Sequence, residues 1–210
     1  MDLRIQVFAK APIPGRVKTR LAVRLGRRGA AQLQSWLIEC ALRTAAAAGI
    51  GTLELWCTPN CEHPFLRDCA RRYAAKLIEQ GSGDLGSRMH RALKAAIDGG
   101  GAGVLIGSDC PSLMPADLLA AAGALEAGCD VVLSPAEDGG YVLVAARRAP
   151  PALFDGIQWG GPAVMAQTRE RLLRLGLRWR ELAPRWDVDR PEDYDRLLRE
   201  GWLPDAEVGS

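Results

Sequence analysis

Short apolar runs alternate with longer stretches of helical periodicity along the whole chain. Runs that predict β-strands lie at 3–8, 52–56, 76–79, 104–107, 130–134, 141–145 and 179–182. Apolar residues with helical spacing predict helices at 29–48, 64–75, 85–97, 115–127, 162–175 and 191–200. This alternation is typical of an α/β protein with a mostly parallel sheet and helices on both faces. The strands at 130–134 and 141–145 are joined directly, which predicts an antiparallel strand within that sheet.

The length and composition fit one globular domain. The chain has 210 residues, and we expect a single domain over 1–203 followed by a flexible tail at 204–210. Hydrophobic residues make up 48% and charged residues 25%, which is enough apolar material for a full core. The net charge of +2 gives no overall preference for nucleic acid, so an anion site would have to be local.

No targeting or membrane-spanning segment is visible in the sequence. Met1 leads almost directly into the first strand, and no apolar run is long enough to cross a bilayer. We therefore expect a cytoplasmic protein without a membrane partner, and the small net charge gives no reason to expect a nucleic-acid partner. The sequence leaves the oligomeric state open.

The run at 104–107 ends in the sequence G-S-D-C-P, which places Asp109 directly after a buried strand. Pro111 stops strand pairing and holds Cys110 in extended geometry, so Asp109 should sit on a fixed turn. Open α/β sheets bind ligands at the carboxyl ends of their strands, where Asp109 would reach into a crevice. The structural alternative is that Asp109 only caps the turn or the helix that follows.

A basic loop follows the first strand and reads F-A-K-A-P-I-P-G-R-V-K-T-R-L. It carries four cations within eleven residues, together with a glycine that allows close backbone approach: Lys10, Gly15, Arg16, Lys18 and Arg20. Because the loop starts where a strand ends, we interpret it as a clamp for phosphate groups. The alternative is a solvated basic surface. A P-loop is not indicated, since Val17 precedes Lys18 and no glycine opens the motif.

A glycine-rich turn precedes the predicted helix at 85–97 and reads G-S-G-D-L-G-S-R-M. Its backbone could pack against a flat base or a ribose, with Gly83, Asp84 and Arg88 as the candidate contacts. The structural alternative is an ordinary turn in which Asp84 is the N-cap of the helix.

A second turn reads S-P-A-E-D-G-G-Y and joins the strands at 130–134 and 141–145. It places two acids, Glu137 and Asp138, beside two glycines, Gly139 and Gly140, at the end of a strand. The glycines would let a ligand approach the backbone. The alternative is a simple hairpin turn, because Asp-Gly is a strong hairpin signal.

An acidic segment near the C-terminus reads W-D-V-D-R-P-E-D. In an extended segment alternate side chains share one side, so Asp187 and Asp189 would lie together and Asp109 could join them. Such carboxylates suit Mg²⁺ or Mn²⁺ held together with substrate phosphates. Three converging carboxylates repel, so Asp109→Asn is expected to abolish turnover without lowering stability in the absence of metal. The alternative is that Asp189 caps the helix that starts at Pro191, and it could do both.

Five motifs in order resemble a known bacterial family: F-A-K-x-P-x-x-G-x-x-K-T-R-L, G-x-L-G-x-R-M, G-S-D-C-P-x-L, P-A-E-D-G-G-Y and D-V-D-x-P-E-D. The family is DUF2064, uncharacterised glycosyltransferase-like proteins, some of which are linked to arsenosugar biosynthesis. It is placed in the nucleotide-diphospho-sugar transferase superfamily, so the resemblance implies a GT-A-like, Rossmann-type fold. The chain is also distantly similar to the phospholactate and molybdenum-cofactor guanylyltransferases, which implies that Asp109, Asp187 and Asp189 hold Mg²⁺.

Two departures from those relatives limit the assignment of the donor. The G-G-x-S-x-R-M-G loop of the molybdenum-cofactor enzymes is absent, and Asp109 is followed by Cys110 and Pro111 rather than by a second acid of a D-x-D motif.

The resemblance implies a Mg²⁺-dependent transferase that uses a nucleotide-sugar donor and a small acceptor. Glu137 or Asp138 could then take the proton from the acceptor hydroxyl. Two alternatives stay open. One is a nucleotidyltransferase, guanylyltransferase-like, that moves a nucleoside monophosphate from a triphosphate to a small phosphorylated acceptor. The other is a nucleotide-binding module without catalysis.

Overall fold

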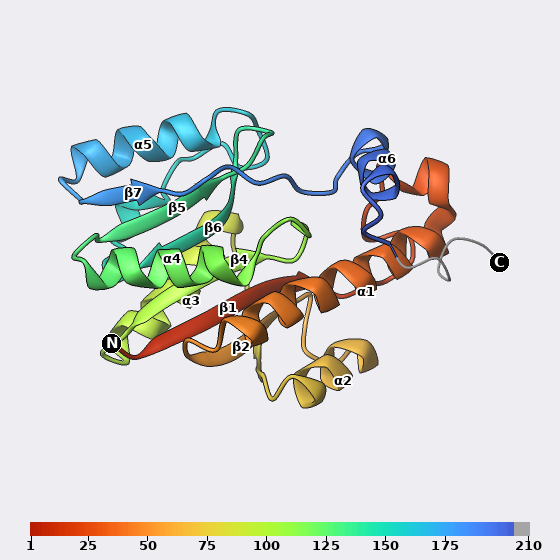
Figure 1. Cartoon of the computed structure of the whole chain (residues 1–210), viewed down its shortest axis with the longest axis horizontal. Helices are drawn as coiled ribbons and strands as arrows, with labels where there is room; N and C mark the ends of the chain where they lie inside the picture. Colours follow the sequence, from red (N-terminus) through yellow and green to blue (C-terminus); the bar gives the residue numbers. More distant parts are fainter. Residues whose placement is uncertain (204–210) are drawn as a thin grey trace.

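One mixed sheet of seven strands forms the centre of the protein (Figure 1). The computed structural model describes residues 1–203, and the tail expected at 204–210 lies outside the described residues. The strand order across the sheet is β3-β2-β1-β4-β6-β5-β7. The strands are β1 (Leu3–Lys10), β2 (Thr52–Thr58), β3 (Lys76–Glu79), β4 (Ala102–Gly107), β5 (Val131–Pro135), β6 (Tyr141–Ala146) and β7 (Trp179–Glu181).

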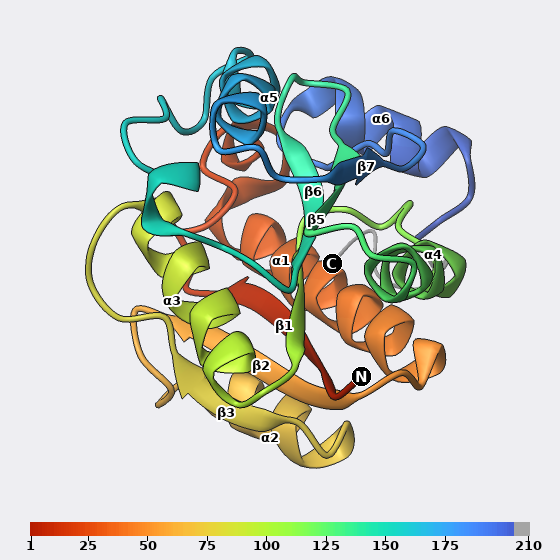
Figure 2. The same cartoon turned by 90° about the vertical axis from the view of Figure 1, so that its left-hand side faces the viewer.

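Helices cover both faces of this sheet, as Figure 2 shows from its edge. They are α1 (Ala22–Ala48), α2 (Pro64–Arg72), α3 (Leu85–Asp98), α4 (Pro115–Glu126), α5 (Val164–Arg174) and α6 (Pro191–Arg199), with a 3-10 helix η1 (Pro151–Leu153). Helices α1, α2 and α4 pack in one core cluster, and α3, α5 and η1 pack in a second on the opposite face. The α/β class with helices on both faces is therefore confirmed.

The strand pattern explains the two clusters. In β1, Leu3, Ile5 and Val7 belong to the cluster with α1 and α4, whereas Phe8 belongs to the cluster with α3. Successive side chains of a strand point to opposite faces, and both faces here are covered, so β1 is buried almost throughout. Strand β6 runs antiparallel to β4 and β5, which confirms the predicted antiparallel strand.

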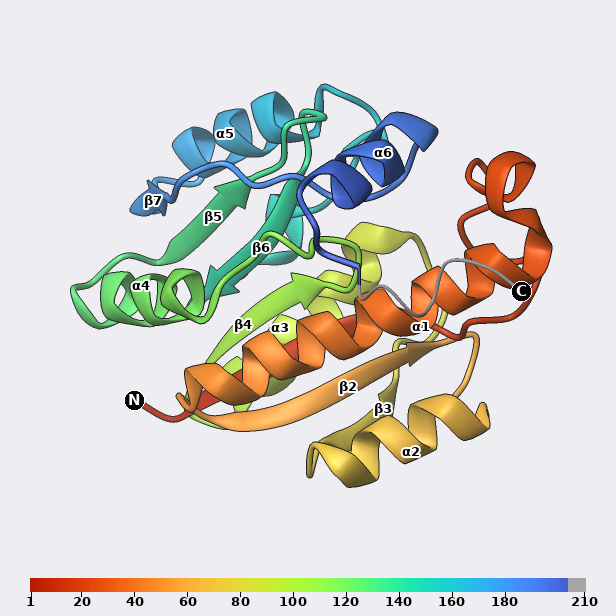
Figure 3. The same cartoon turned by 45° about the vertical axis from the view of Figure 1, so that its right-hand side comes forward.

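The N-terminal part of α1 differs from the prediction. The helix begins at Ala22, seven residues before the predicted start at 29, and Gly26 breaks it with φ 67° and ψ 169°. Leu21 is fully buried in a third cluster with Leu33 and Leu37 of α1 and with residues of α6, and this packing holds the N-terminal part of the helix. Figure 3 shows the whole length of α1, which runs along the sheet beside β1 and β2. The segment 20–29 contains several arginines and two glycines, so its apolar residues do not show the spacing that predicts a helix.

The sheet topology places a crevice at its centre. Strands β1 and β4 are parallel neighbours with Phe8 opposite Gly107, and the chain leaves β1 toward β2 on the other side. Ligands in open α/β sheets bind outside the carboxyl ends of strands at such a switch point. Among the described residues, no helix is both long and apolar enough to cross a membrane.

Candidate functional site

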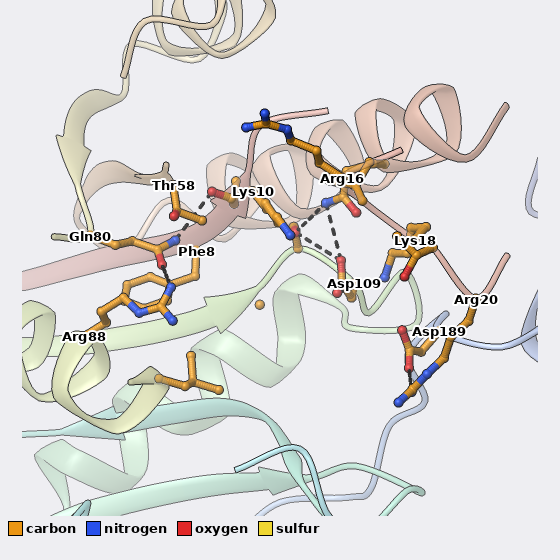
Figure 4. A pocket seen from close by; sticks show the side chains of 17 residues that line it. Phe8, Lys10, Arg16, Lys18, Arg20, Thr58, Gln80, Arg88, Asp109 and Asp189 are labelled. Atoms are coloured by element: carbon orange, nitrogen blue, oxygen red, sulfur yellow. Dashed lines mark hydrogen bonds and ion pairs between the residues drawn. The ribbon is translucent and has the colours of Figure 1, made fainter. Parts of the chain in front are cut away.

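A cleft with a volume of about 580 Å³ opens at the carboxyl ends of β1 and β4 (Figure 4). Five cations and two carboxylates line it: Lys10, Arg16, Lys18, Arg20, Arg88, Asp109 and Asp189. Figure 4 shows Gln80 and Arg88 at one end, the Arg20–Asp189 pair at the other, and Asp109 between them. The excess of positive charge suits a ligand with several negative charges, such as a diphosphate.

Lys18 ties the basic loop to the two acidic segments. Its side chain is only 3% exposed, and its Nζ donates to the carbonyl oxygen of Val188 at 2.6 Å. The same Nζ lies 2.8 Å from Oδ2 of Asp109. The backbone N–H of Val188 donates to the carbonyl oxygen of Asp109 at 2.8 Å. Three segments far apart in sequence therefore meet at one buried ammonium group.

Asp109 faces the cleft with a side chain that is 45% exposed. One carboxylate oxygen accepts from Oγ of Ser108 at 3.2 Å and from Nε2 of Gln34 at 3.5 Å. Asp109 does not cap α4, because Asp117 accepts from the backbone N–H of Met114 at 2.8 Å. The helix-capping alternative for Asp109 is therefore wrong.

The segment at 186–189 alternates as predicted. Trp186 and Val188 are buried in the cluster with α1 and α6, while Asp187 and Asp189 lie on the more exposed side. Burial raises the pKa of Asp187 to about 6, and the negative charges of Asp138 and Asp109 add to the rise while Lys18 opposes it. Asp187 therefore lies in the electrostatic field of two other carboxylates.

The carboxylate of Asp189 does not contact Asp109 or Asp187 in a shared metal site. It forms an ion pair with Arg20 at the edge of the cleft. Within residues 1–203, no three Asp, Glu, His or Cys side chains are grouped so that they could hold a metal ion. The three predicted metal ligands are thus split, with Asp187 near Asp109 and Asp189 on Arg20.

Asp189 is also not the cap of α6. The N-cap residue of α6 is Arg190, and Oδ2 of Asp193 in the first turn accepts from the backbone N–H groups of Asp189 at 3.0 Å and Arg190 at 2.7 Å. The capping alternative for Asp189 is wrong, and its side chain is left for Arg20 and the cleft.

The turn between β5 and β6 is fixed by contacts with other segments of the protein. None of its four candidate residues lines the cleft. Glu137 lies 2.9 Å from Arg196, whose guanidinium stacks 4.3 Å over the ring of Trp186. Asp138 accepts from the backbone N–H of Gly140 at 2.9 Å, which closes the turn. A simple hairpin turn therefore explains the presence of Gly140 without a ligand.

Gly139 has a packing reason of its own. Its φ is +93°, and a Cβ there would lie 2.2 Å from the carbonyl oxygen of Pro162. The backbone N–H of Met165 donates to the carbonyl oxygen of Gly139 at 2.9 Å. The glycine is thus required by the segment that leads into α5, independently of any ligand.

Replacement of Gly139 by alanine is expected to lower stability more than the same change at Gly160. Both glycines have positive φ, but nothing lies within 4 Å of a Cβ at Gly160. Gly160→Ala should therefore cost only about 1–2 kcal/mol for the left-handed backbone, and Gly139→Ala should cost clearly more. Chemical denaturation of the two variants measures the difference. Equal losses would show that the contact with Pro162 imposes no constraint.

Of the candidate residues at the start of α3, Asp84 is the N-cap of the helix and Arg88 lines the cleft. Asp84 accepts from the backbone N–H of Ser87 at 2.8 Å, so the N-cap alternative is confirmed. Arg88 lines the cleft and donates to Oε1 of Gln80 at 3.3 Å. Neither Gly83 in this turn nor Gly15 in the basic loop lines the cleft. A Cβ at Gly15 would touch the side chain of Arg27 at 3.3 Å.

Two glutamines of the cleft were not predicted from the sequence. Gln34 is 3% exposed and donates to Oγ of Ser108 at 3.2 Å, from the middle of α1. Gln80 is also 3% exposed and donates to the carbonyl oxygen of Trp56 at 2.9 Å. The available signal for Gln34 was its polar side chain on the apolar face of α1, next to Leu33 and Leu37.

The comparisons with known proteins agree with this fold and cleft. The family model described as "Uncharacterized protein conserved in bacteria (DUF2064)" matches residues 41–161. A crystal structure from Desulfovibrio desulfuricans G20, provisionally named a nucleotide-diphospho-sugar transferase, is 31% identical with a TM-score of 0.86. That match covers 100% of this chain and 92% of the other. No curated protein matches the chain.

Two further structures share the fold at lower identity. A nucleotidyl transferase from Methanothermobacter thermautotroptrophicus is 18% identical with a TM-score of 0.65, over 96% of this chain and 98% of the other. Glucosyl-3-phosphoglycerate synthase from Mycobacterium tuberculosis, in complex with Mn²⁺, UDP and glucosyl-3-phosphoglycerate, is 17% identical with a TM-score of 0.55. That match covers 100% of this chain and 83% of the other.

The fold and the relatives define an enzyme of the transferase class, with a GT-A-like sheet and a single α/β domain. Within that class, the chain belongs to the DUF2064 family, as the order of its motifs indicated.

Proposed function

We propose that this protein is a transferase that depends on a divalent cation and moves a sugar from a nucleotide-sugar donor to a small acceptor. The observation that carries the proposal is the cleft at the carboxyl ends of β1 and β4, where five cations face Asp109. The name of the 31% identical relative, a nucleotide-diphospho-sugar transferase, supports this donor class.

The diphosphate of the donor would lie along the basic loop. Lys10, Arg16 and Arg20 come from this loop, and Arg88 comes from the opposite end of the cleft. Their charges would offset those of the two phosphates in a site that is partly shielded from water. Lys18 is already bound to Val188 and Asp109, so its first role is to position the acidic groups relative to the phosphates.

The acidic groups fit a hard divalent cation. Burial, together with the negative charges of Asp138 and Asp109, raises the pKa of Asp187, and a cation between Asp109 and Asp187 would stabilise the ionised carboxylates. One or two carboxylates together with substrate phosphates are the usual protein set for Mg²⁺. Asp189 would join this set only if it left Arg20. Bound Mg²⁺ or Mn²⁺ would neutralise negative charge on the leaving phosphate.

The transfer step needs a group that accepts the proton of the acceptor hydroxyl. The hydroxyl oxygen forms a bond to the anomeric carbon, the bond from that carbon to the phosphate oxygen breaks, and a nucleoside diphosphate leaves. We assign the proton to Asp138 rather than to Glu137, because the carboxylate of Glu137 is held by Arg196, whereas the charge of Asp138 acts on Asp187.

A nucleotidyl transfer is the second candidate. The four cations that directly follow β1 favour it, because a triphosphate carries more negative charge than a nucleotide-sugar. In that reaction an acceptor phosphate would attack the α-phosphorus and pyrophosphate would leave. A link to arsenosugars, a cytoplasmic location and the absence of nucleic-acid partners stay predictions from the sequence.

The leaving group distinguishes the two reactions. Water can replace the acceptor slowly, so the protein is incubated with a panel of nucleotide-sugars and nucleoside triphosphates in Mg²⁺ or in EDTA. Release of nucleoside diphosphate from a nucleotide-sugar, in Mg²⁺ only, supports the proposal. Release of pyrophosphate from a triphosphate supports the second candidate. A protein that binds nucleotides but releases neither product in either condition would be a binding module.

The basic loop gives a direct prediction for binding. Arg16→Ala is expected to weaken nucleotide binding about tenfold, or about 1.4 kcal/mol, because it removes one phosphate partner from the cleft. Arg28→Ala is the matched control, since Arg28 is exposed near the same loop but does not line the cleft. Calorimetric titration measures both, and equal affinities in the two variants would make the loop a solvated surface.

A further inference from the structure

Helix α3 borders two separate hollows. Leu85 and Arg88 line the cleft at the carboxyl ends of the strands. Ser87, His90, Arg91 and Lys94 line a second hollow, of about 310 Å³. Residues three, four and seven apart share one face of a helix, so the second set forms its own surface two turns long.

The second hollow is basic on one wall and apolar on the other. His90, Arg91 and Lys94 come from α3, and Pro151, Phe154 and Asp155 come from η1 and the residues after it. The rings of His90 and Phe154 lie 6.1 Å apart. Lys94 pairs with Asp98 on the exposed side of α3, an i,i+4 contact that is weak and easily exchanged.

The apolar wall is firmly placed. Phe154 is 3% exposed and belongs to the core cluster with α3 and α5. Arg171 of α5 donates twice to the carbonyl oxygen of Asp155, at 2.9 and 2.6 Å. The hollow is therefore a fixed space between two anchored elements, and Asp155 is its one carboxylate among the lining residues.

We propose that this hollow is a second ligand site, and that it takes a small phosphomonoester with an apolar group. The phosphate would face Lys94, Arg91 and His90, and the carbon part would lie against Pro151 and Phe154. Among the lining residues, the two permanent cations Arg91 and Lys94 outnumber the one carboxylate, and the phosphate would replace Asp98 as the partner of Lys94. Pro151 is exposed and supplies most of the apolar surface of this wall, since Phe154 is only 3% exposed, and an ester would cover that surface where inorganic phosphate would leave it in water.

Arg91 is the one member of the hollow that also supports the nucleotide cleft. Its guanidinium donates to the carbonyl oxygen of Gln80 and, at 3.1 Å, to that of Ser82. Gln80 lines the cleft. A test of the second site must therefore leave Arg91 in place, and His90 and Lys94 are the residues to change.

The test is calorimetric titration of phenyl phosphate into the full chain, with the nucleotide cleft saturated by a nucleoside diphosphate and Mg²⁺ where such binding occurs. Parent protein is compared with Lys94→Ala, with the double variant His90→Gln/Lys94→Ala, and with Arg16→Ala in the cleft. All three changes are at residues outside the core clusters, so folding should be retained, and a thermal melt checks it.

Phenyl phosphate is expected to bind the parent and Arg16→Ala alike, and to bind the double variant at least tenfold more weakly, with Lys94→Ala between them. Inorganic phosphate should bind more weakly than phenyl phosphate. Equal affinity in the parent and the double variant overturns the proposal. Loss of binding in Arg16→Ala alone also overturns it, because the ligand would then lie in the nucleotide cleft, and so does a parent that binds neither compound.

Discussion

Replacement of Asp109 by asparagine is expected to abolish turnover and to lower the free energy of unfolding by about 1–3 kcal/mol. The loss of turnover follows from the proposed role of Asp109 beside the cation and the donor phosphates. The loss of stability follows from Lys18, whose ammonium is 3% exposed and lies 2.8 Å from this carboxylate. Without the negative charge, a buried ammonium would keep only the carbonyl oxygen of Val188 as a strong partner.

This expectation differs from the one drawn from the sequence, in which repulsion among the carboxylates leaves Asp109→Asn no less stable than the parent in the absence of metal. The sequence could not reveal that Lys18 reaches it. Chemical denaturation in EDTA measures the change, with Asp68→Asn as control, because Asp68 makes only exposed ion pairs on α2 and should change stability by less than about 0.5 kcal/mol. An Asp109→Asn variant as stable as the control would contradict the role of Lys18, and one that keeps full turnover would contradict the proposed site.

Replacement of Asp187 by asparagine should have the opposite effect on stability. Burial and the charges of Asp138 and Asp109 raise the pKa of Asp187 from 3.8 to about 6, so the ionised carboxylate is less favourable in the folded state. At pH 7 without metal, the free energy of unfolding of Asp187→Asn is expected to be about 2–3 kcal/mol higher than that of the parent. The same variant should lose the stabilisation that Mg²⁺ gives to the nucleotide-bound parent.

The pH dependence gives this prediction a definite sign. An acid with a raised pKa costs stability above that pKa, and the cost decreases between pH 6 and 3.8 as the group takes up its proton in the folded state. The advantage of Asp187→Asn should therefore be largest at pH 7 and should be nearly gone at pH 4. Denaturation of both proteins at several pH values in EDTA decides it. An advantage that is absent at pH 7, or that grows as the pH falls, would show that Asp187 is not under repulsion.

The sheet was the part of the fold that the sequence predicted best. An apolar run that ends in glycine marks the buried strand β4, which extends over Ala102–Gly107 where 104–107 was predicted. The more exposed strand at 76–79 was predicted with its observed bounds. The part of α1 before Gly29 was missed, because it is held by Leu21 and Leu25, which pack in a cluster with residues of α6 that are far away in sequence. Tertiary packing of this kind leaves no local pattern.

The sequence predicted which charged residues line the cleft, but it could not predict which of them form ion pairs. The motifs indicated that the basic loop and Asp109 would meet at one edge of the sheet, and the loop cations do line the cleft with Asp109. The partners of each charge depend on how the fold brings together residues that are 59 to 169 positions apart: Arg20 pairs with Asp189, Arg196 with Glu137, and Lys18 with Asp109. Spacing along the chain carries no information about which of these pairs forms.

A thermal-shift titration with nucleoside diphosphates and nucleotide-sugars, in Mg²⁺ and in EDTA, tests the central claim most directly. Parent protein and Asp187→Asn are compared at pH 7. At a ligand concentration 100 times Kd, binding should stabilise the parent by about 2.7 kcal/mol. The account predicts that at least one of these ligands gives such a shift in Mg²⁺, that EDTA reduces it, and that Asp187→Asn shows no difference between the two conditions. A parent that no nucleotide stabilises, or that is stabilised equally in EDTA, would contradict the account.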